Sequence, residues 1–98
     1  MNRWFRMRRA YEGLNEIIDF GLELFNGNVN ERSLKRWYDY SGSAVDHCSR
    51  DVHRSIYLDY LRLIAALENR NDLSAKARVG GCLDYLAEMS QWLRGQIG

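Results

Sequence analysis

Apolar residues recur every three or four positions along most of the chain, which is the spacing of one face of an α-helix. The first run predicts a helix from Arg3 to Phe25. Its apolar stripe comprises Trp4, Met7, Tyr11, Leu14, Ile18, Gly21, Leu22 and Phe25. At about 100° per residue, the opposite face carries acidic side chains. Asn26-Gly27 then predicts a left-handed cap at the end of this helix.

The middle of the chain predicts two further helices. Asn30 is a favourable N-cap for a short second helix that carries Leu34, Trp37 and Tyr38. We expect Ser41-Gly42-Ser43 to end it and a third helix to run from Ala44 to Glu68, although one long helix kinked at Gly42 is an alternative. Residues 56–67 are apolar around nearly the whole helix, which predicts that the third helix is the buried central element.

The last part of the chain predicts a fourth helix, capped by Asp72 or Ser74. Its apolar stripe comprises Val79, Cys82, Leu83, Leu86, Met89, Leu93 and Ile97. Gly80-Gly81 lies inside this stripe, which favours a close helix approach or a local break. The chain has no proline and no strand pattern, so the predicted fold class is all-α: one helical domain over residues 1–98, a bundle of about four helices.

Charge and composition exclude several classes of protein. The chain has 14 basic and 13 acidic residues and a net charge of +1, so no strong overall field attracts nucleic acid or anionic lipid. It has no apolar run of about 18 residues, so we expect no membrane span. Its 2 cysteines are too few for a disulfide framework, and we expect a cytoplasmic location.

Histidine and cysteine side chains raise the question of a metal or catalytic site. His47 and His53 are six residues apart, which places them about 240° apart around a helix, where they cannot chelate one ion. Cys48 and Cys82 lie on predicted apolar stripes. The i, i+4 pairs, Ser49 with His53 and His47 with Asp51, are common by chance on helix surfaces. We therefore predict no metal, no cofactor and no enzymatic activity.

The charge order of the first helix is unusual. Arg3, Arg6, Arg8 and Arg9 come before Glu12, Glu16, Asp19 and Glu23, whereas the helix dipole favours acids first and bases last. An antiparallel neighbour with the same order would match basic ends to acidic middles. This predicts self-association, with a homodimer as one candidate, or docking on a complementary helix. The predicted partner-binding residues are Arg6, Arg9, Glu16, Glu23, Arg32, Arg36, Tyr40, Tyr85 and Trp92.

These features favour a non-enzymatic protein-interaction module whose arginine and aromatic anchors bind a protein partner. Small helical proteins of this kind often come from phages or mobile elements and act as inhibitors or adaptors, an association that rests on base rates and on no residue of this chain. Such a protein acts on a larger host complex, for example a nucleic-acid-handling defence complex. The alternative is a nucleic-acid-binding accessory subunit that uses residues 3–9 and 32–40, where basic and aromatic side chains alternate. Nucleic acid is thus a secondary candidate partner.

Overall fold

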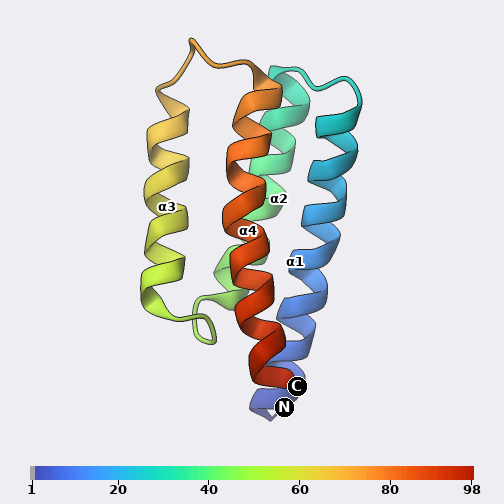
Figure 1. The fold of residues 1–98 in the computed structure, drawn as a ribbon, viewed down its shortest axis with the longest axis vertical. Helices are drawn as coiled ribbons and strands as arrows, with labels where there is room; N and C mark the ends of the chain where they lie inside the picture. Colours follow the sequence, from blue (N-terminus) through green and yellow to red (C-terminus); the bar gives the residue numbers. More distant parts are fainter. Residues whose placement is uncertain (1) are drawn as a thin grey trace.

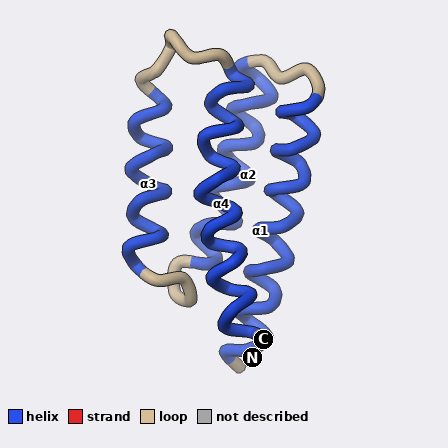
Figure 2. The backbone as a smooth tube through the Cα atoms, in the orientation of Figure 1, coloured by secondary structure: helices blue, strands red, loops and turns tan. Residues whose placement is uncertain are grey.

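The computed structural model describes residues 2–98, which form four α-helices (Figure 1). These are α1 (Arg3–Asn26), α2 (Glu31–Cys48), α3 (Arg54–Glu68) and α4 (Ala75–Ile97). Short loops join them in an up-and-down order, and no strand occurs within residues 2–98 (Figure 2). The predicted all-α class is therefore confirmed. Both termini lie at the same end of the bundle, where the Trp4 indole N–H donates to the carbonyl of Ile97 at 3.1 Å.

The central element is α4, not α3 as the sequence pattern predicted. Helix α4 packs against α1 on one side and α3 on the other, and α2 lies behind α1 and α4 (Figure 1). Val79, Cys82 and Leu86 of α4 are fully buried, whereas on α3 only Tyr60 and Leu67 are buried. The apolar residues of α3 therefore exceed what one side of an edge helix can bury, and Leu61 remains 41% exposed.

Polar side chains cap the helix starts. The Asn30 side chain accepts from the backbone N–H of Ser33 at 2.9 Å, and the Ser33 hydroxyl accepts from the N–H of Asn30, which completes a capping box. The Ser74 hydroxyl accepts from the N–H of Ala77, so Ser74 is the cap of α4. The cap at the end of α1 differs from prediction, because Gly27 has φ −112° and is not left-handed.

Helix α2 continues past Ser41-Gly42-Ser43 and ends only at Cys48, so the predicted break is wrong. Ser41 is fully buried and takes the place of an apolar residue between Trp37 and Val45, so the buried stripe continues through it. The long kinked helix is wrong as well, because the chain turns at residues 49–53 and α3 begins at Arg54 rather than Ala44. The side chain of His53 caps α3 by accepting from the N–H of Ser55 at 3.2 Å.

Two glycines mark close approaches inside the bundle. A Cβ at Gly21 would lie 2.6 Å from the indole of Trp37, and one at Gly80 would lie 3.0 Å from the ring of Phe25. The predicted close approach therefore occurs, and α4 stays helical through Gly80-Gly81. The predicted stripe of α1 is wrong at its edges, since Trp4 and Leu22 are more than 40% exposed.

Candidate protein-docking surface

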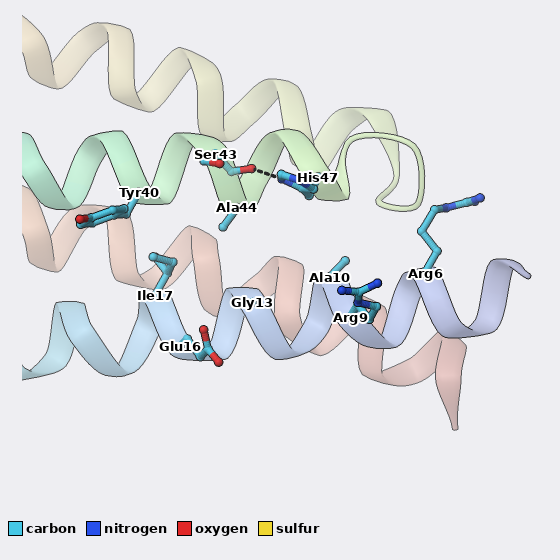
Figure 3. A pocket seen from close by; sticks show the side chains of 10 residues that line it. All are labelled: Arg6, Arg9, Ala10, Gly13, Glu16, Ile17, Tyr40, Ser43, Ala44 and His47. Carbon is cyan, nitrogen blue, oxygen red and sulfur yellow. Dashed lines mark hydrogen bonds between the residues drawn. The ribbon is translucent and has the colours of Figure 1, made fainter. Parts of the chain in front are cut away.

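A groove with a volume of about 560 Å³ lies between α1 and α2 (Figure 3). Its walls are formed by Arg6, Arg9, Ala10, Gly13, Glu16 and Ile17 of α1 and by Tyr40, Ser43, Ala44 and His47 of α2. Four of the lining residues have small side chains or none: Ala10 and Gly13 on α1, and Ser43 and Ala44 on α2. The two helices therefore leave a hollow that their own side chains do not fill.

The position of the groove follows from how α1 and α2 are held together. Further along α1, the missing side chain of Gly21 lets the two helices approach over the indole of Trp37. The indole N–H of Trp37 donates to the carbonyl of Ile17 at 3.0 Å, and Trp37 has no exposed surface. This buried contact holds α1 and α2 together next to the groove.

Aromatic side chains stand at one end of the groove. Tyr40 is 53% exposed, and its ring centroid lies 6.4 Å from that of Phe20, which is 38% exposed. The sequence prediction included Tyr40 but missed Phe20. The sequence does contain a sign that Phe20 is exposed, because this residue lies off the apolar stripe of α1, where a large apolar side chain has no core to enter. Exposed aromatic residues of this kind are typical of interface hot spots.

Two of the charges along the groove have no ion-pair partner within residues 2–98. They are Arg9 and Glu16, both on α1. Arg8 is already paired with Glu12 at 3.4 Å, and Arg6 reaches away from the groove to a carboxylate beyond α2. Arg9 and Glu16 therefore remain available to groups outside the chain.

The carboxylate that Arg6 contacts belongs to Asp51, in the turn between α2 and α3. Arg6 donates to its two oxygens, from Nε at 3.0 Å and from Nη2 at 2.7 Å, while Arg3 lies 4.0 Å away. The Asp51 side chain is fully buried. The hydrogen bonds from Arg6 hold the pKa of Asp51 below its ordinary value, and they also raise that of Arg6. This pair ties the start of α1 to the turn, and the sequence prediction missed it.

The structure brings only some of the predicted partner-binding residues together. Arg6, Arg9, Glu16 and Tyr40 all line the groove. The other five lie outside its lining. They are Glu23, exposed on α1; Arg32 and Arg36, exposed on α2; and Tyr85 and Trp92, half-buried on α4 against the core.

The two basic segments proposed for nucleic acid lie apart. Residues 3–9 begin α1 and residues 32–36 begin α2, at opposite ends of a molecule 42 Å long (Figure 1). Trp37 is buried and Tyr38 half-buried, with its hydroxyl out of contact with solvent. Among the aromatic residues of this second segment, only Tyr40 is exposed for stacking.

The histidine and cysteine side chains considered above for a metal or catalytic site make contacts within the chain or are buried. Nδ1 of His47 lies 2.7 Å from the carbonyl oxygen of Ser43, and Nδ1 of His53 lies 2.8 Å from the hydroxyl of Ser55. Burial raises the pKa of both cysteine thiols to about 12. Between residues 2 and 98, no group of three His, Cys, Asp or Glu side chains is placed to hold a metal ion.

Comparison of the chain with protein-family models, with curated proteins and with solved structures found no match. Over residues 2–98, no helix has both the length and the apolar character that a membrane crossing requires.

Proposed function

We propose that this chain is a non-enzymatic protein-interaction module that binds its partner along α1 and the adjoining α1–α2 groove. The observation that carries the proposal is the combination of exposed aromatic rings with unpaired charges beside one hollow. Phe20 and Tyr40 supply the rings, and Arg9 and Glu16 supply the charges. Aromatic and arginine side chains dominate the binding energy of protein interfaces.

A protein partner fits this surface better than nucleic acid does. Glu12, Glu16, Asp19 and Glu23 lie between the basic start of α1 and the basic start of α2, and their charges repel phosphate groups. A mixed pattern of charges gives specificity for a protein surface of opposite pattern. The groove between two helices is also the shape that accepts an amphipathic helix from a partner.

Within this class, the role we propose is that of an inhibitor or adaptor from a phage or mobile element. It would occupy a surface of a larger host complex, such as a nucleic-acid-handling defence complex. The location we propose is the cytoplasm, and the free, buried state of both cysteines is consistent with that proposal.

Site-specific photo-crosslinking tests this function. A photoreactive amino acid replaces Tyr40 in the groove or, as a matched control, Leu61, which is 41% exposed on the distant helix α3. We expect protein crosslinks from position 40 only, unchanged by nuclease treatment of the native host extract. Equal crosslinking from both positions, or products lost on nuclease treatment, would contradict the proposal. A fall in binding with salt as steep as several phosphate contacts produce would favour nucleic acid instead.

A further inference from the structure

Helix α1 carries an exposed stripe that faces away from the core, which we call the outer stripe. It consists of Phe5, Arg9, Glu12, Gly13, Glu16 and Phe20. At 3.6 residues per turn these positions fall within an arc of about 100°. Phe5 is 54% exposed and Phe20 38% exposed, so two large apolar rings stand in solvent at the two ends of the stripe.

The outer stripe is complementary to itself when its direction is reversed. An antiparallel copy that places residue 5 opposite residue 20 also places residue 9 opposite residue 16 and residue 12 opposite residue 13. Phe5 then meets Phe20, and Arg9 meets Glu16. Each of these contacts occurs twice, because the two-fold axis of such a pair passes between Glu12 and Gly13. One register therefore matches aromatic rings at both ends of the stripe and an arginine with a glutamate on each side of the centre, where Glu12 lies opposite Gly13.

We propose that a second copy of this chain docks on the outer stripe, antiparallel and in this register. The inference rests on the proposed function in that it names the partner of the α1 surface. Tyr40 enlarges the apolar end of the interface, since its ring packs beside that of Phe20. The Phe5 ring of the second copy then meets two aromatic rings instead of one.

Arg9 and Glu16 are the charges of the outer stripe that the fold leaves unpaired, and this register brings them together. The fold of one copy engages Arg6 with Asp51 and Arg8 with Glu12. Arg9 and Glu16 keep no partner within residues 2–98 and lie seven residues apart, about 10 Å along the helix. Two helices that cross antiparallel midway between these residues bring each arginine to the opposite glutamate.

Gly13 lies beside this crossing point. A Cβ there would meet nothing within 4 Å, so the fold of one copy does not require a glycine at this position, although glycine weakens a helix. At a helix crossing, the missing side chain lets the two backbones approach. Gly42 and Gly95 have the same open space, but only Gly13 lies at the centre of the matched stripe.

The size of the contact sets the expected strength. Phe5 and Phe20 are fifteen residues apart, so the outer stripe is about 22 Å long. A single helix pair of this length lies at the small end of specific interfaces. We therefore expect a reversible dimer with a dissociation constant in the micromolar range, strengthened by low salt.

Charge reversal tests the register directly. In the Arg9→Glu variant, two glutamates face each other at each contact. In the Glu16→Arg variant, two arginines face each other there. We therefore expect each variant alone to dimerise at least about tenfold more weakly than the wild type. In an equimolar mixture of the two variants, a heterodimer again has one glutamate opposite one arginine at both contacts. We expect that heterodimer to be as strong as the wild-type dimer. The double variant R9E/E16R should likewise recover self-association.

Sedimentation velocity measures each outcome from low micromolar to several hundred micromolar protein, with circular dichroism as the check on folding. The matched control is Arg36→Glu, an exposed charge on α2 outside the outer stripe, which should leave dimerisation unchanged. A monomer at every concentration, or a mixture that does not recover, overturns the second copy as partner. Position-40 crosslinks to a different protein would then still support the proposed function, and their absence would overturn that function separately.

Discussion

Replacing Gly21 by alanine adds one methyl group where α1 crosses α2. An ideal Cβ there would lie 2.6 Å from Cζ2 of Trp37, 2.9 Å from its Cε2 and 2.8 Å from Cδ2 of Leu83. Carbon atoms in contact are ordinarily about 3.5–4.0 Å apart, so the indole or the helix must move by about 1 Å. Trp37 has little freedom to do so, because it is fully buried and donates a hydrogen bond to Ile17.

The change in unfolding free energy caused by Gly21→Ala has two contributions of opposite sign. Forcing an extra methyl group into a packed core costs about 1–3 kcal/mol. Alanine is a better helix former than glycine by about 1 kcal/mol, which offsets part of that cost. Gly13→Ala supplies the matched control, because its Cβ meets nothing within 4 Å and it gains the same helix propensity. The difference between the two variants therefore isolates the steric cost at Gly21.

Urea unfolding, followed by circular dichroism at dilute protein concentration, measures this difference. We expect Gly13→Ala to stabilise the fold and Gly21→Ala to be less stable than Gly13→Ala by about 1–3 kcal/mol. In a chain of this length each kcal/mol corresponds to roughly 4–8 °C in Tm. Equal changes in the two variants would refute the close α1–α2 approach over Trp37.

Two further predictions concern ionisable groups in the core. The depressed pKa of Asp51 stabilises the fold above the ordinary aspartate pKa of about 3.9, and this contribution is lost as the pH falls through the lower pKa of the folded state. The difference in unfolding free energy between wild type and Asp51→Asn, measured by urea unfolding, should therefore shrink as the pH is lowered from 5 toward 2. A difference that is constant with pH would contradict the Arg6–Asp51 pair. Cys48 and Cys82, whose pKa values burial raises to about 12, should react with a disulfide reagent at pH 8 only as fast as the chain unfolds, and rapid reaction of the native protein would show that they are exposed.

The sequence predicted most of the fold because the apolar spacing of α1, α2 and α4 is regular. Its predicted helix boundaries are wrong where a polar residue is buried within a helix or an apolar residue is buried within a turn. Ser41-Gly42-Ser43 has the composition of a turn, but Ser41 is fully buried and the chain stays helical there. Conversely, Val52 fits the apolar spacing of a helix, but it is buried in the turn at residues 49–53.

The place of α3 could not be predicted from its own composition. Residues 56–67 are more apolar than an edge helix needs, and the pattern within one helix does not say how many neighbours cover it. That number depends on the chain path, which here turns so that α4 enters between α1 and α3 (Figure 1). For the proposed docking surface, the sequence prediction included Arg9, Glu16 and Tyr40. It missed Phe5 and Phe20, because they lie off the apolar stripe that defined the helix.

The order of charges along α1 opposes the helix dipole, and three of its arginines differ in the contacts that they make. Arg6 donates two hydrogen bonds to the buried carboxylate of Asp51, so its place near the start of α1 serves a tertiary contact that the helix dipole does not take into account. Arg8 is paired with Glu12 on the same helix. Arg9 has neither kind of partner within residues 2–98, and it lies on the outer stripe at the distance from Glu16 that an antiparallel copy matches. Arg9 is thus the arginine of α1 that the proposed second copy would pair with a glutamate.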